Sequence, residues 1–101
     1  MRTIIFSGLI LFAMLDAHAW GDLTGRWSCN DGGTYYLRQI GEQVHWYGEA
    51  TDVRPAWSNV FSGRVHKGHI KGRWTDVPKG RTAASGDLEL VIEKNGHALR
   101  A

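Results

Sequence analysis

The stretch FSGRVHKGHIKGRWT, residues 61–75, alternates small or apolar residues with polar ones on both sides of a Lys67-Gly68 pair. Successive side chains of a β-strand point to opposite faces, so this alternation indicates strands with one buried face. Glycine tolerates the positive φ that tight two-residue turns require. The stretch therefore predicts an antiparallel hairpin, with strands over residues 61–66 and 70–75.

The same alternation recurs along the chain, over residues 23–28, 44–49 and 88–93. Short segments rich in Gly, Asn, Asp or Pro separate these stretches, at residues 30–33, 41–42, 77–80 and 95–96. Such residues favour turns, so consecutive strands are expected to be antiparallel neighbours. No segment carries a helical period. The sequence predicts an all-β fold, an up-and-down meander of about six or seven strands.

Glycines fall in phase with the apolar positions of four strands. Glycine weakens a strand, so its repeated placement on one face indicates sharp coiling of the sheet or room for a large side chain from the opposite wall. A small barrel provides both and also removes exposed sheet edges. We therefore expect the meander to be closed or nearly closed. The four positions are Gly25, Gly48, Gly63 and Gly72.

The first nineteen residues have the features of a secretory signal peptide. Arg2 precedes an apolar run over residues 4–15, and an Ala-x-Ala pattern ends at Ala19. A basic start, a short apolar run and small residues at the cleavage point are typical of such peptides, and an N-terminal membrane anchor is the alternative. We expect cleavage after Ala19, one β-barrel domain over residues 20–101, and a periplasmic or secreted location without stable membrane insertion.

The C-terminal residues leave little room for a returning strand. Asn95-Gly96 is a hairpin signal, and only residues 97–101 follow it. Either the last strand is very short or the sequence is truncated at its C-terminus.

Cys29 is the only cysteine of the chain. An intrachain disulfide is therefore impossible, and the fold must be stabilised by packing. We expect a buried, inert thiol; a reactive thiol or an intermolecular bridge are the alternatives.

The residues offer no convincing metal, cofactor or catalytic set. His66 and His69 flank a turn and His45 shares their phase, but no second thiolate or suitably spaced carboxylate completes a zinc site. Phosphate-binding and dinucleotide-binding fingerprints are absent. We predict no metal, no cofactor and no catalytic residues.

The basic stretch HIKGRWTDVPKG, residues 69–80, raises the question of nucleic-acid binding. Alternation places Trp74 on the buried face, whereas His69, Lys71 and Arg73 lie on the outer one. A single-strand platform needs aromatic rings on the same face as the cations. We therefore expect a solvated charged face and do not expect nucleic acid as a partner.

Aromatic and polar side chains gather around two turns. Tyrosine, arginine, amide and carboxylate groups suit planar hydrogen bonding and stacking on sugars or other polar ligands. A loop tryptophan at a barrel mouth is a plausible ligand contact. The alternative is that Trp57 plugs the barrel end and the tyrosines divide between core and surface. The predicted ligand-binding residues are Asn30, Asp31, Tyr35, Arg38, Tyr47 and Trp57.

Two long stretches carry a resemblance. LTGRWSCNDGGTYYLRQIGEQVHWYGEA (23–50) and WSNVFSGRVHKGHIKGRWTDVPKGR (57–81) resemble a group of small secreted bacterial β-barrel-like proteins with an Asn-Asp-Gly-Gly-x-Tyr-Tyr turn and a Trp-x-Asp-Val-Pro-x-Gly turn. This resemblance covers most of the chain after residue 19 and implies fold and secretion, but no activity. LTGRW (23–27) also resembles the first strand of avidin-like and lipocalin-like barrels. The chain departs from the avidin pattern beyond these residues, so biotin binding is not implied.

Together these features lead us to expect a secreted, non-catalytic binding module. Its expected ligand is a carbohydrate or another small polar molecule of the cell envelope. The first alternative is a protein-binding inhibitor of a secreted enzyme, acting through the same loops. The second is a small enzyme of unknown reaction.

Overall fold

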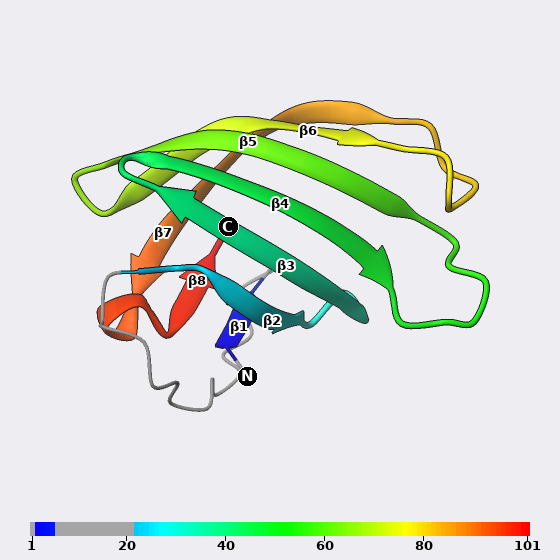
Figure 1. Cartoon of the computed structure of the whole chain (residues 1–101), viewed down its shortest axis with the longest axis horizontal. Helices are drawn as coiled ribbons and strands as arrows, with labels where there is room; N and C mark the ends of the chain where they lie inside the picture. The colour runs from blue at the N-terminus through cyan, green and yellow to red at the C-terminus, as the bar shows by residue number, and fades with distance from the viewer. Residues whose placement is uncertain (1, 6–21) are drawn as a thin grey trace.

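The computed structural model describes residues 2–5 and 22–101, which form a closed β-barrel (Figure 1). Each strand is hydrogen-bonded to the next around the barrel, and β1 closes the ring by pairing with both β2 and β8. The strands are β1 (Arg2–Ile5), β2 (Gly25–Cys29), β3 (Gly33–Ile40), β4 (Gln43–Ala50), β5 (Ser58–His66), β6 (His69–Asp76), β7 (Ser85–Glu93) and β8 (Ala98–Arg100). A single 3-10 turn, η1 (Lys94–Gly96), is the only helical element among the described residues.

The predicted all-β meander and its closure are confirmed. Strands β2 to β8 pair antiparallel in sequence order. The described residues form eight strands rather than six or seven, because β8 is a separate short strand and β1 comes from the predicted signal peptide. The apolar run beyond residue 5 and the predicted cleavage point after Ala19 lie outside the described residues.

The predicted hairpin over residues 61–75 is present as β5 and β6. His66 pairs with His69 across the two-residue turn, where Lys67 and Gly68 have φ of 51° and 78°. Positive φ at both central residues is the pattern of the type I′ turn, which suits the twist of the strands it joins. Ile40 likewise pairs with Gln43 in the β3–β4 hairpin.

The barrel interior holds the hydrophobic core. Trp27 is fully buried, and its indole nitrogen donates a hydrogen bond to the Leu23 carbonyl at 2.9 Å. Trp46 stacks on Phe61 with ring centroids 4.2 Å apart. The buried core residues are Ile4, Leu23, Trp27, Cys29, Tyr35, Leu37, Val44, Trp46, Phe61, Ile70, Leu90 and Leu99.

The connections separate into two ends of the barrel. Figure 1 shows the tight β3–β4 and β5–β6 hairpins at one end and the longer β4–β5 and β6–β7 connections at the other. The longer connections cover residues 51–57 and 77–84. The end that carries these long connections is called the mouth below.

Candidate ligand-binding site

The turn between β2 and β3 fixes Asp31 at the mouth. One carboxylate oxygen accepts a hydrogen bond from the Gly33 amide at 2.8 Å, and the other accepts one from the Tyr35 hydroxyl at 2.5 Å. Asp side chains commonly bond to backbone two residues ahead in turns of this kind. The carboxylate is thereby anchored while the residue remains exposed to solvent.

Tyr35 is buried inside the barrel, with 2% of its surface exposed. Its ring meets Trp46 edge-on at 5.1 Å between centroids. It fills the space over its cross-strand partner Gly48, where a Cβ would lie 2.4 Å from the tyrosine ring. Burial, followed by the hydrogen bond to Asp31, raises the pKa of Tyr35 well above its ordinary value. The hydroxyl therefore stays protonated and acts as the donor to Asp31.

Trp57 packs against the aromatic side chains inside the barrel. Its ring is tilted by 36° against Tyr35, with centroids 5.7 Å apart, and it packs over Gly33. Both Arg81 and Thr82 donate backbone hydrogen bonds to the Ala56 carbonyl, which ties the β6–β7 connection to the segment that carries Trp57. Trp57 is thus a half-buried wall residue of the mouth rather than a loosely held loop residue.

Two adjoining cavities of about 250 and 330 Å³ open at the mouth. Both are lined by Asp31, Tyr35, Asn59 and Trp74. The smaller is completed by Trp46 and Leu88, and the larger by Trp57, Asp76, Thr82 and Ala84. The two linings contain two carboxylates and four aromatic side chains, but neither contains a lysine or an arginine.

The polar groups of these cavities are held in place. The Asn59 side-chain oxygen accepts a hydrogen bond from the Trp46 indole at 2.9 Å. One Asp76 carboxylate oxygen accepts a hydrogen bond from the Ala84 amide, also at 2.9 Å. Aromatic faces beside fixed acceptors suit a ligand that carries apolar faces and hydroxyl or amino donors.

The six predicted ligand-binding residues do not all meet at this site. Asp31, Tyr35 and Trp57 line the mouth cavities, and Asn30 lies in the adjacent turn, where its side-chain oxygen is 3.6 Å from the Cys29 sulfur. The remaining two lie elsewhere. Arg38 is exposed on the outer face of β3.

Tyr47 belongs to a separate cluster on the outer face of β4. Its hydroxyl donates to a Glu49 carboxylate oxygen at 3.0 Å, and Lys79 donates to the same oxygen at 2.9 Å. The hydrogen bond from Lys79 lowers the pKa of Glu49 most strongly, and the Tyr47 hydroxyl adds to the effect. Tyr47 and Arg38 therefore do not line the mouth cavities, and the mouth geometry does not support a ligand-binding role for them.

Sequence reasoning missed the cavity roles of Asn59, Trp74 and Asp76. Trp74 was expected to lie in the core, but it is only partly buried and lines the mouth. Asn59 and Asp76 face each other as cross-strand partners at the mouth ends of β5 and β6. The pairing of the predicted hairpin, continued from its turn toward the mouth, brings Asn59 opposite Asp76.

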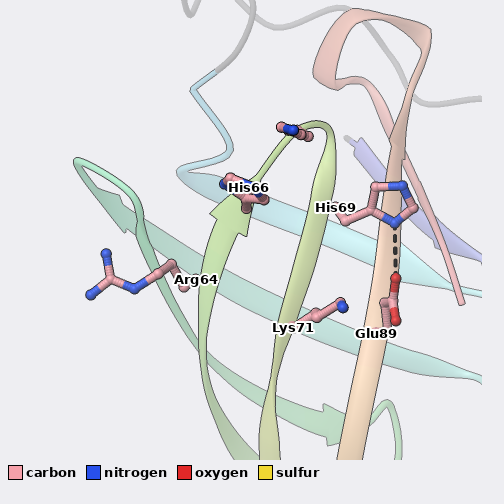
Figure 2. Close-up of a pocket in the computed structure, with 6 residues that line it drawn as sticks. Arg64, His66, His69, Lys71 and Glu89 are labelled. Atoms are coloured by element: carbon pink, nitrogen blue, oxygen red, sulfur yellow. Dashed lines mark hydrogen bonds and ion pairs between the residues drawn. The ribbon is translucent and has the colours of Figure 1, made fainter.

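A larger hollow, of about 460 Å³, lies at the opposite end of β5 and β6. Figure 2 shows His69 hydrogen-bonded to Glu89, with Arg64 and Lys71 nearby. The hollow contains no aromatic ring other than its imidazoles, and Trp74 lies on the other face of β6. His69 and Lys71 thus lie apart from Trp74, as the alternation predicts. Its lining residues are Arg64, His66, Lys67, His69, Lys71 and Glu89.

Cys29 is buried inside the barrel with 7% of its surface exposed. Desolvation is the largest influence on the thiol and raises its pKa far above the ordinary value. Within residues 2–5 and 22–101, no cluster of three or more His, Cys, Asp or Glu side chains is arranged to hold a metal ion. No helix in this same part of the chain is both long and apolar enough to cross a membrane.

Comparison of the chain with protein-family models, with curated proteins and with solved structures gave no match.

Proposed function

We propose that the protein is a secreted, non-catalytic binding module whose mouth takes a carbohydrate or a similarly small, hydroxyl-rich molecule of the cell envelope. The observation that carries this proposal is the meeting of Asp31, Tyr35 and Trp57 in the mouth cavities. Ring faces stack on the apolar faces of sugars, while carboxylate and amide oxygens accept from sugar hydroxyls. The cavities, of about 250 and 330 Å³, are of a size that suits a small ligand rather than an extended chain.

The carboxylates of the mouth restrict the charge that a bound ligand can carry. Asp31 and Asp76 line it without a lysine or arginine beside them. A carboxylate or phosphate on the ligand would meet like charge, whereas a hydroxyl or an ammonium group would meet an acceptor. The proposed ligand is therefore a neutral sugar or an amino sugar, and acidic sugars are disfavoured.

Calorimetric titration with neutral, amino and uronic acid oligosaccharides tests the proposal. Neutral or amino sugars should bind, and Asp31→Ala should weaken that binding by about tenfold or more, because it removes a charged acceptor. Trp57→Phe should also weaken binding by reducing the stacking area, without emptying the wall of the mouth. Calorimetry avoids the loss of a fluorophore that accompanies this variant.

Arg38→Ala and Tyr47→Phe are the matched controls, since both residues lie on the outer face. They should leave sugar affinity unchanged. Preferential binding of uronic acids, or equal losses in Asp31→Ala and Arg38→Ala, would contradict the mouth as the site.

One observation favours a second candidate, an inhibitor that binds a secreted enzyme. Val53 is fully exposed at the connection that leads from β4 to Trp57. A partner protein that covers the mouth connections would bury this apolar side chain and gain the free energy of its transfer from water. Salt-resistant capture of a secreted hydrolase, abolished by Val53→Asp and accompanied by no response to sugars, would replace the sugar proposal with this one.

A further inference from the structure

Strand β1 occupies a gap that is one strand wide, between β2 and β8. It runs parallel to both neighbours, with Thr3 in register with Ser28 on one side and Ala98 on the other. The seven other strands alternate in direction, so β2 and β8 run the same way and do not pair with each other. Figure 1 shows β1, in blue, beside β2 and β8. The gap between β2 and β8 is called the seam below.

The seam contains a position that binds a positively charged side chain, and positions of the seam that bind one side chain are called seats below. Arg2 has only 2% of its surface exposed, and its guanidinium donates to the backbone carbonyls of Asp22, Thr24 and Gly96. It also lies over the Trp27 ring, 4.8 Å from the centroid. Carbonyl oxygens and an aromatic face both favour a positive charge. This seat selects a basic side chain at one position of any strand in the seam.

The seam also contains a seat for an apolar side chain two residues further along. Ile4 is fully buried in the core and pairs with Cys29 and Leu99. Between the two seats, the Thr3 hydroxyl lies 3.4 Å from that of Ser28. The strand that fills the seam is thus specified as basic, small and polar, then apolar, with backbone hydrogen bonds on both sides.

Arg2–Ile5 also belongs to the predicted signal peptide, and removal of that peptide would remove β1. The edges of β2 and β8 would then be without a partner strand, and such edges pair readily with an extended segment of another chain. We infer that the seam of the exported protein is a strand-binding groove, which accepts an extended segment of a partner protein with a basic residue followed two positions later by a β-branched apolar one. This inference goes beyond the proposed sugar site and rests on the predicted processing.

The first test is the N-terminus of the exported protein. Intact-mass measurement should give a chain that begins at Trp20. Recovery of exported protein that retains Arg2–Ile5 would overturn the inference, because the seam would then remain filled by its own chain.

The second test replaces β1 by a peptide. A protease site is placed within residues 6–21 of the full chain, which is folded first and then cut. Fluorescence anisotropy follows the uptake of a labelled peptide with the sequence of residues 1–5. The peptide should bind saturably to the cut protein and not to the uncut one. A peptide carrying Arg2→Ala should bind about tenfold more weakly or worse, because the carbonyl seat is left empty.

A disulfide lock provides the matched control. Thr3→Cys with Ser28→Cys, in a Cys29→Ala background, should hold β1 in the seam, so that the cut and oxidised protein takes up no peptide until it is reduced. If loss of β1 unfolds the barrel, added peptide should restore it. Absence of both uptake and refolding, equal binding of the Arg2→Ala peptide, or pairing of two cut barrels through the seam would each overturn the inference.

Discussion

Gly72 is a residue where a single added methyl group meets several atoms. It pairs with Gly63 across β5 and β6, and a Cβ there would lie 2.1 Å from the Ser62 carbonyl oxygen and 2.8 Å from the Phe61 ring. The closest obstacle is the backbone of the neighbouring strand, which cannot rotate away as a side chain can. The paired glycines therefore leave room for the Phe61 ring.

Gly72→Val should destabilise the barrel by about 3 kcal/mol through overpacking. Lys71→Val, one residue away on the exposed outer face, should change the free energy of unfolding by less than about 1 kcal/mol. Urea unfolding of both variants measures the difference. Equal effects would contradict the inward orientation of Gly72.

Cys29 should be chemically inert in the folded protein. Burial raises its pKa, so the thiol remains protonated and the reactive thiolate is not populated between pH 7 and pH 9, roughly the range in which an ordinary thiol ionises. Alkylation by iodoacetamide should be slow, and because only the thiolate reacts, its rate should keep rising with pH and should not level off near pH 8.5. In denaturant the rate should be much higher and should level off above the ordinary thiol pKa of about 8.5. A native rate that follows this ordinary titration would contradict the buried position.

Strand alternation explains why Tyr35 reaches the mouth while Arg38 and Tyr47 do not. Tyr35 points inward, and Arg38, three positions along the same strand, must then point outward. Tyr47 pairs with the exposed Tyr36 and shares its face. Residue types indicate the chemistry of a site, but only their spacing along a strand shows which of them share a face.

The β5–β6 turn is strained at Lys67, and a different residue at this position would relieve the strain. Lys67 adopts a φ of 51°, a left-handed conformation that costs a residue with a Cβ about 1 kcal/mol. Asparagine adopts this conformation more readily and is favoured in type I′ turns. Lys67→Asn should therefore stabilise the protein by about 0.5 to 1 kcal/mol.

Thermal unfolding measures this change as an increase in Tm of a few degrees, roughly 4 °C for a chain of this length. Gly68→Ala is the opposite control and should lower the Tm, because alanine at a φ of 78° is strained. A lower Tm for Lys67→Asn would contradict the turn geometry.

The longest strands show the alternation most clearly. Strands of nine residues, such as β5 and β7, repeat the alternation of buried and exposed side chains several times. The three residues of β8 contain too few to distinguish a strand from a loop. The segment Arg2–Ile5 has the β-branched residues of a strand, but it also begins an apolar run typical of an export signal, and composition alone supports both interpretations.

At the scale of the molecule, the aromatic mouth and the basic hollow lie at opposite ends of β5 and β6. Oligonucleotides should bind only weakly to the hollow, and this binding should disappear as salt rises toward about 200 mM, because phosphate contacts without base stacking are dominated by counterion release. Lys71→Gln should weaken it further. Titration at several salt concentrations tests both points.

The mouth variant Trp57→Phe is the control for this experiment, since Trp57 is remote from the hollow and should not alter oligonucleotide binding. Tight binding at high salt that depends on Trp57 would contradict the separation of the two ends.

The pairing of β1 with β8 has a consequence for the order of events during synthesis. Thr3 pairs with Ala98, so β1 cannot complete its pairing with β8 until residue 98 has left the ribosome. Contacts between such distant positions form late and slowly in folding. Until then the barrel cannot close, and the translated chain can form at most an open sheet. Arg2–Ile5 also begins the predicted export signal, so under that prediction recognition of the signal and closure of the barrel compete for the same residues.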